Sequence, residues 1–180
     1  MLKTANFDGK KITIKTLSKK DLKNSKKFQD FLNSLIKENA KISRNKPISL
    51  KQEKVWLKEE IKATKAHQKI FLIAEAEGKI VGTVEIGLEK GRQSHIGGLG
   101  ISIRNGYRGI GLGKYLMKEI IKLAKKKLKS KPKIIRLSVL PNNKPAIDLY
   151  KKCGFKKVAA IPKQMQYKGK LLDEIVMLLD

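Results

Sequence analysis

Acidic residues are scarce in this sequence: 16 Asp and Glu stand against 42 Lys and Arg, which gives a formal net charge of +26. Such a charge disfavours long-range attraction of basic partners and favours polyanions such as nucleic acid or ribosomes. Only five of the cations are arginines, however, and aromatic residues make up 6% of the chain. Because arginine and aromatic side chains dominate phosphate and base recognition, nucleic-acid binding is not the first interpretation of the charge.

Three further absences narrow the class of protein. Cys153 is the single cysteine, so the chain forms no intramolecular disulfide, which fits a reducing compartment, and we expect a cytoplasmic protein. Residues 1–15 contain no apolar core of a secretory leader, and no apolar run approaches the ~20 residues of a membrane-spanning helix. His67 and His95 have no Cys or acidic partners at ligand spacing, so we expect no metal.

Apolar residues make up 41% of the 180 positions, which predicts one globular domain, 1–180, with a sizeable core. Period-2 and short apolar runs predict strands, and apolar spacing of three and four predicts helices. The strands are expected at 11–17, 69–76, 80–88, 96–103, 133–140, 155–161 and 174–179. The helices are expected at about 18–40, 49–67, 111–128 and 145–153.

This order predicts an α/β (α+β) fold in which about four helices flank a mixed sheet of about 6–7 strands. The helix at 111–128 connects the strands at 96–103 and 133–140, and such a crossover makes its two strands parallel neighbours. The strands at 69–76, 80–88 and 96–103 and the last two strands follow one another through turns or a loop, so most strand pairs are expected to be antiparallel.

The most informative stretch is residues 104–114, which hold four glycines and three cations between an apolar strand and an amphipathic helix. A glycine-rich turn that enters a helix is typical of a phosphate site, because the first helical N–H groups lack intrahelical partners and the helix dipole favours an anion. Arg108 and Lys114 add charge that suits a pyrophosphate.

The glycine spacing excludes two common phosphate loops. A Walker A loop needs glycine where Arg108 stands and a hydroxyl residue where Tyr115 stands. A dinucleotide fingerprint needs Gly-x-Gly-x-x-Gly, whereas Gly109, Gly111 and Gly113 are each two residues apart. The pattern that fits is Arg-x-x-Gly-x-Gly.

That pattern, Arg108 to Gly113, resembles the acetyl-CoA pyrophosphate loop of the GCN5-related N-acetyltransferases, the GNAT family. A second segment, from Asn143 through Ala146, Leu149 and Tyr150 to Gly154 and Phe155, is similar to the family's Asn-x-x-Ala-x-x-Leu-Tyr-x-x-x-Gly-Phe motif without a gap. The element order also matches from Lys11 to Leu179. The resemblance therefore covers nearly the whole chain and implies the GNAT fold.

The resemblance implies where acetyl-CoA binds. Residues of the loop would hold the pyrophosphate, the end of the preceding strand would pair with the pantetheine arm, and Asn143 would bond the same arm. A backbone N–H of that strand would polarise the thioester carbonyl. The implied contacts are Ile101, Ser102, Ile103, Arg108, Gly109, Ile110, Gly111, Leu112, Gly113, Lys114 and Asn143.

The resemblance also implies a general acid. In many members a tyrosine at the position of Tyr150 protonates the leaving thiolate; the alternative is a packed helix residue whose hydroxyl is merely hydrogen-bonded. The glutamate that histone-type members use as a base falls on Gly97 here, so this role does not carry over. Glu85 is a substitute candidate, beside the simpler interpretations of a solvated strand residue or of proton loss through water.

The sequence thus predicts direct transfer of acetyl from acetyl-CoA to a primary amine in a ternary complex. A protein N-terminal or lysine amine is favoured as acceptor, and a small-molecule amine comes next. The alternative is a nucleic-acid or ribosome-binding protein on a GNAT scaffold. We expect a monomer or homodimer, a packing role for Cys153, a core or cleft position for Trp56, and a solvated lysine stripe on the helix at 111–128.

Overall fold

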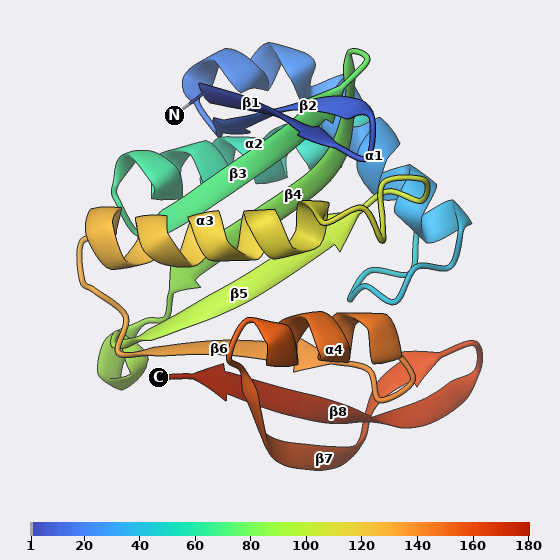
Figure 1. Cartoon of the computed structure of the whole chain (residues 1–180), viewed down its shortest axis with the longest axis vertical. Helices are drawn as coiled ribbons and strands as arrows, with labels where there is room; N and C mark the ends of the chain where they lie inside the picture. Colours follow the sequence, from blue (N-terminus) through green and yellow to red (C-terminus); the bar gives the residue numbers. More distant parts are fainter. Residues whose placement is uncertain (1) are drawn as a thin grey trace.

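The strands form a single sheet. The computed structural model describes residues 2–180, and its eight strands follow the order β1-β2-β3-β4-β5-β6-β8-β7 (Figure 1). They are β1 (Leu2–Phe7), β2 (Lys10–Thr16), β3 (Lys69–Ala76), β4 (Lys79–Leu88), β5 (Ile96–Ile103), β6 (Ile134–Val139), β7 (Lys156–Tyr167) and β8 (Lys170–Leu179). Every neighbouring pair is antiparallel except β5 and β6, which are parallel. The predicted mixed, mostly antiparallel sheet is confirmed.

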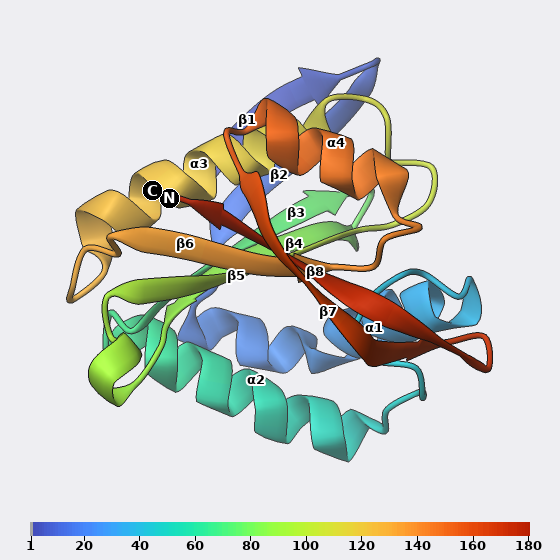
Figure 2. The same cartoon turned by 90° about the horizontal axis from the view of Figure 1, so that it is seen from below.

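Two helices cover each face of the sheet. Figure 2 shows α1 (Ser25–Lys37) and α2 (Leu50–Lys65) on one side, and α3 (Leu112–Lys127) and α4 (Lys144–Lys152) on the other. The short 3-10 helices η1 (Lys19–Asn24) and η2 (Gly91–Gln93) complete the list of helical elements in residues 2–180. None of the described helices is long and apolar enough to span a bilayer.

The first predicted helix is divided in the structure. Residues 19–24 form η1, and the α-helix begins only at Ser25. The Ser18 N–H and hydroxyl both donate to the Asp21 carboxylate, at 3.0 and 2.9 Å, and these bonds hold a tight turn before α1. Leu22 packs from η1 onto the core, so the apolar pattern that predicted one helix spans both elements.

An N-terminal strand, β1, was not predicted. It pairs with β2 in register from Leu2 opposite Lys15 to Phe7 opposite Lys10. Asp8 and Gly9 connect the strands with φ values of +52° and +75°, as a type I′ turn requires. This Asp-Gly pair is a hairpin signal that could have identified β1, which brings the sheet to eight strands.

The core has two layers. The layer between the sheet and the α3–α4 side is centred on Leu112, Leu116, Met117 and Ile120, all fully buried. The second layer is smaller and lies between the sheet and α1–α2, where it contains Phe28, Phe31, Leu35 and Leu57. Together they hold the sheet, including β5, between the α3–α4 layer and the α1–α2 layer.

Candidate functional site

The β5 strand has an open edge near its carboxyl end. It pairs with β4 from Gly97 to Ile103 but with β6 only from Ile96 to Gly98. Beyond that point β6 pairs with β8 on its other side, and no described strand pairs with residues 99–103 on the β6-facing edge. An extended ligand can therefore add to β5 at this edge as another strand would.

The hydrogen bonds show which backbone groups face the open edge. The Arg104 N–H donates to the Val81 carbonyl, towards β4, at 2.9 Å, whereas the Ile103 carbonyl accepts from the Arg108 side chain on the opposite side. Backbone groups alternate along a strand, so Leu99 and Ile101 face the same way as Ile103. Leu99 thus joins the predicted set, and the backbone groups of Ser102 point towards β4.

The loop after β5 needs glycine for its backbone conformation. Gly106, Gly109 and Gly111 have φ values of +81°, +79° and +86°, a left-handed region that other residues rarely adopt. A Cβ atom on any of the three would meet no atom within 4 Å, so conformation, not space, is what requires glycine there.

Gly113 serves a different purpose. It lies in the first turn of α3, where a Cβ atom would stand 3.0 Å from Leu149 Cδ2 of α4 and 3.2 Å from Ile103 Cδ1 of β5. Glycine at this position allows α3 to approach both neighbours closely. The two motifs of the sequence therefore meet here, because Leu149 belongs to the second one.

The N-terminus of α3 has the features of an anion site. Its N-cap is Gly111, which has no side chain to accept a hydrogen bond, and the first turn contains no acidic residue. The first intrahelical bond is the one from the Tyr115 N–H to the Gly111 carbonyl, so the N–H groups of Leu112, Gly113 and Lys114 have no partner within the helix. These donors and the helix dipole fit a pyrophosphate.

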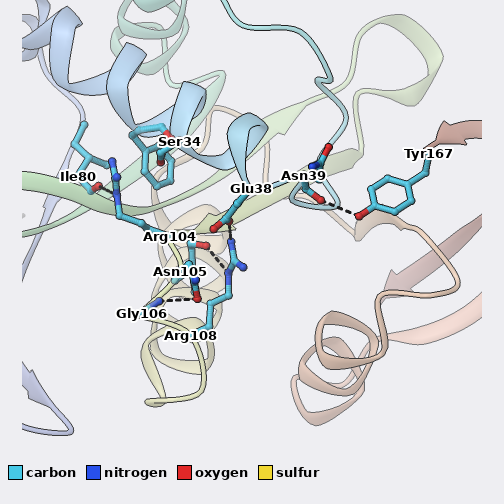
Figure 3. Close-up of polar contacts among 11 residues, drawn as sticks. Ser34, Glu38, Asn39, Ile80, Arg104, Asn105, Gly106, Arg108 and Tyr167 are labelled. Carbon is cyan, nitrogen blue, oxygen red and sulfur yellow. Dashed lines mark hydrogen bonds and ion pairs between the residues drawn. The ribbon is translucent and has the colours of Figure 1, made fainter. Parts of the chain in front are cut away.

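The Arg108 side chain supports the loop. Its Nε donates to the Ile103 carbonyl at 2.7 Å, and its guanidinium forms an ion pair with Glu38 at the end of α1 (Figure 3). Lys10, in β2, donates to the Gly106 carbonyl and lies 4.8 Å from the centre of the Tyr107 ring. The loop is thus held from both sides. The Gly106 and Tyr107 N–H groups bond within the loop, to Asn105 Oδ1 and the Arg104 carbonyl, and the described hydrogen bonds leave those from Arg108 to Lys114 for a ligand.

The second motif forms α4, which begins at its N-cap, Asn143. The Asn143 carbonyl accepts from the Ala146 and Ile147 N–H groups, each at 3.1 Å, whereas its side chain makes no capping bond. The described hydrogen bonds give that amide no partner. Burial raises the pKa of Tyr150, which is 7% exposed, to about 12, so its hydroxyl is protonated at neutral pH.

Glu85 lies on the opposite face of the sheet from α3. A Cβ atom on Gly100, its cross-strand partner in β5, would stand only 3.3 Å from Glu85 Oε1, so the glycine leaves room for the carboxylate. Burial raises the pKa of Glu85; the Coulomb effect of Lys69, whose Nζ lies 3.6 Å from Oε2, partly opposes this. Lys69 is also paired with Glu60, which raises the pKa of Glu85 further.

Gly97, in contrast, offers no place for a base. A Cβ atom there would lie 2.8 Å from Ile86 Cγ2 and 3.3 Å from Pro132 Cβ, on the side of the sheet covered by α3. A carboxylate at this position would clash with the core. The structure therefore agrees with the inference that the base of histone-type members does not carry over to residue 97.

Sequence reasoning missed the junction between α1 and α2, residues 38–49. It contacts three segments that are distant in sequence. Glu38 binds Arg108, and the Asn39 carbonyl accepts from the Tyr167 hydroxyl at 2.8 Å (Figure 3). Lys41 Nζ donates to the Asn142 carbonyl at 2.5 Å. These partners are 70, 128 and 101 residues away in sequence, so no local pattern indicates them.

Two further residues singled out in the sequence, Cys153 and Trp56, pack against the hydrophobic core. Cys153 is half-buried and packs against the main core, and burial raises the pKa of its thiol. Trp56 packs against the α1–α2 core with its ring 5.9 Å from that of Phe71. Among residues 2–180, no three His, Cys, Asp or Glu side chains are grouped as a metal site would need.

Comparisons with known proteins identify relatives of this chain. The chain is 30% identical over 108 residues to an N-alpha-acetyltransferase of Sulfurisphaera tokodaii, a match that covers 54% of this chain and 62% of the relative. It is 31% identical over 107 residues to the L-amino acid N-acetyltransferase AaaT of Escherichia coli, over 59% of this chain and 65% of the relative. The matches thus span somewhat less than two thirds of each relative.

A solved structure shares the fold. It is that of yncA, a putative acetyltransferase from Salmonella typhimurium with its cofactor acetyl-CoA, at a TM-score of 0.77 and 19% identity over 94% of this chain and 93% of that one. The sequence profile of the Acetyltransferase (GNAT) family matches residues 35–155, from the end of α1 to the residue after the second motif's glycine. The chain belongs to the GNAT family of acetyltransferases.

Proposed function

We propose that this protein transfers the acetyl group of acetyl-CoA to a primary amine in a ternary complex. One observation carries the proposal: the open edge of β5 leads, through the glycine loop, to an uncapped α3 N-terminus. A strand edge suits the amide groups of a pantetheine arm, and the helix N-terminus suits the pyrophosphate that follows it. The donor thus has a continuous series of backbone partners.

In this proposal the loop from Arg108 to Lys114 binds the pyrophosphate through its N–H groups, with the Lys114 ammonium as added charge. Leu99, Ile101 and Ile103 offer backbone groups to the pantetheine arm, and Asn143 offers its side-chain amide. The Ile103 carbonyl already accepts from Arg108, so its N–H is the remaining group of that residue at the open edge. An N–H of this edge would polarise the thioester carbonyl.

The chemical step joins the amine nitrogen to the acetyl carbon and breaks the carbon–sulfur bond. The sulfur leaves with the bond electrons and takes a proton from the Tyr150 hydroxyl, and the nitrogen loses one proton to become an amide. Because the Tyr150 pKa is near 12, this hydroxyl keeps its proton until negative charge develops on sulfur. The tyrosine regains its proton from solvent after the products leave.

Glu85 is the proposed acceptor of the amine proton, directly or through water. Its carboxylate lies against Gly100, one residue before Ile101 on the open strand. A carboxyl whose pKa is raised by burial is a stronger base than an exposed one, provided that it is ionised when the amine arrives. Lys69 favours this ionised form.

We place protein N-terminal or lysine amines first among the acceptors and small-molecule amines such as amino acids second. One relative is named an N-alpha-acetyltransferase and the other an L-amino acid N-acetyltransferase, which supports an amine as acceptor. An experiment must choose between the two kinds of amine. The decisive assay incubates the protein with acetyl-CoA and a panel of peptides, amino acids and polyamines, and detects the added acetyl group by mass spectrometry. Calorimetry with acetyl-CoA tests the donor site separately.

Two outcomes would contradict the proposal. Absence of acetyl-CoA binding at millimolar concentration would remove the donor site. Binding of acetyl-CoA without transfer to any amine, together with steeply salt-dependent binding of RNA, would favour the alternative of a nucleic-acid or ribosome-binding protein on this scaffold. The variant Glu85→Gln tests the proposed base while Tyr150, the proposed acid, stays in place. It should lower kcat and leave acetyl-CoA affinity unchanged.

A further inference from the structure

Two hollows of the surface lie away from the glycine loop, between η1 and α2. These adjoining hollows, of about 510 and about 820 Å³, share Lys19, Leu22 and Lys58. Together they form one groove, and we call it the η1–α2 groove. Its lining is Lys19, Lys20, Leu22, Lys23, Lys54, Lys58, Ile61, Lys62, Lys65 and Ala66.

The groove carries uncompensated positive charge. Seven lysines line it and no carboxylate does. Within residues 2–180 none of these seven lysines forms an ion pair, and the nearby Asp21 is buried and bound by Lys15 at 2.7 Å. Like charges on one surface repel one another, so an anionic partner would relieve the repulsion as well as add attraction.

The lysines on α2 follow the helix axis. Lys54, Lys58 and Lys62 are spaced by four residues and are all exposed, so they form a ridge with ~6 Å of axial rise between neighbours. Beside this ridge the floor is apolar: it is made of Leu22, Ile61 and Ala66. The groove therefore combines a regular row of cations with a strip of apolar surface.

This combination distinguishes between two anionic partners. Lysines alone attract nucleic acid through its phosphates, but specific recognition of nucleic acid relies on arginine forks and stacking aromatic rings, and the lining contains neither. An acidic amphipathic helix offers carboxylates at four-residue spacing, with the same ~6 Å rise, and apolar side chains for the floor. We propose that the η1–α2 groove binds an acidic amphipathic helix of a partner protein.

The groove is separate from the acetyl-transfer site. None of its lining residues belongs to β5, the glycine loop or α4, and neither Glu85 nor Tyr150 contributes to it. The lining therefore shares no residue with those proposed for acetyl transfer. The inference accordingly stands on its own contacts and charges, whether or not the protein acetylates an amine.

The test uses a fluorescent helical peptide with glutamates at four-residue spacing and one leucine stripe, and measures binding by anisotropy at about 150 mM salt. The variant Lys54→Glu/Lys58→Glu/Lys62→Glu should weaken binding about tenfold or more, because three charge pairs become repulsive. The matched control Lys118→Glu/Lys122→Glu/Lys126→Glu makes the same change in net charge on exposed residues of α3. It should weaken binding about twofold at most, since salt screens distant charges.

Three results would overturn the proposal. Equal losses in the two variants would indicate non-specific attraction by the whole +26 surface. Unchanged affinity for a peptide whose leucines are replaced by serine would show that the apolar floor binds nothing. Tighter binding of single-stranded RNA, lost in the groove variant alone, would assign the groove to nucleic acid. The neutral set Lys54→Gln/Lys58→Gln/Lys62→Gln, with thermal unfolding as a check, covers the case in which charge reversal disturbs the fold.

Discussion

The donor side and the acceptor side of the proposed site are built in different ways. The donor side consists mainly of backbone groups from two contiguous segments, residues 99–114 and the start of α4. The proposed acceptor side consists of side chains from α2, β3, β4 and the junction between the first two helices. The first kind of site depends on local conformation and the second on packing between distant elements.

This difference extends to the titratable groups. On the donor side, burial raises the pKa values of Tyr150 and Cys153, which keeps both groups neutral near pH 7. On the α1–α2 side of the sheet, which we call the acceptor-side layer, burial raises the pKa values of Glu53 in α2 and Glu85 in β4. For a carboxyl, a raised pKa brings the titration closer to neutral pH. The acceptor side should thus be the more pH-sensitive half.

The largest expected effect belongs to the donor side. Tyr150→Phe removes the hydroxyl that protonates the leaving sulfur and keeps the buried ring, so kcat should fall about 100-fold or more. Acetyl-CoA affinity, measured by calorimetry, should stay within about twofold, because the ring packs as before. A variant that keeps full activity from low to high pH would leave Tyr150 as a packing residue beside Phe155.

The same contrast explains what the sequence could predict. The glycine loop, α3 and the second motif are local, so spacing and residue type identified them, and the parallel β5–β6 pair followed from the crossover. The ion pair between Glu38 and Arg108 and the bond from Tyr167 to Asn39 depend on how distant elements pack. No periodicity in the sequence encodes such contacts, whereas β1 has a local signal in its Asp8-Gly9 turn.

The second prediction concerns Glu53, a buried residue in the first turn of α2. Burial raises its pKa from an ordinary 4.5 to about 7, against a smaller opposite effect of Arg44. The folded state then binds more protons than the unfolded state between these values, so the free energy of unfolding should decrease as pH rises from about 4.5 to about 7 and change little above. The contribution is up to about 3 kcal/mol.

The measurement is chemical denaturation of the wild type and of Glu53→Gln at a series of pH values. The difference between the two proteins isolates Glu53 from the other carboxyls. We expect the wild type to lose stability relative to the variant as pH rises through that window. Parallel curves would show that Glu53 titrates alike in both states, and the acceptor-side layer would then lack the pH sensitivity inferred above.

The third prediction tests the backbone character of the donor side. Gly111→Ala places a Cβ at a φ of +86°, where a non-glycine residue costs about 1–2 kcal/mol, so acetyl-CoA affinity should fall about tenfold. Gly91→Ala is the matched control: Gly91 also has a positive φ, of +59°, and an empty Cβ position, but it lies in η2. Equal affinities of both variants for acetyl-CoA would show that the α3 N-terminus does not bind the donor.

The smallest effect concerns the ion pair that joins the two sides. Glu38→Gln keeps the size of the side chain and removes its charge, which frees the guanidinium that also holds the Ile103 carbonyl. The side chains of Arg108 and Glu38 are 47% and 25% exposed, so the pair is screened and the KM values for acetyl-CoA and amine should each rise only about threefold. Asp30→Asn, which removes an exposed pair with Lys26 at 2.8 Å, should change neither value. If Glu38→Gln raises the amine KM alone, the donor side does not depend on this pair and the two halves of the site are mechanically independent.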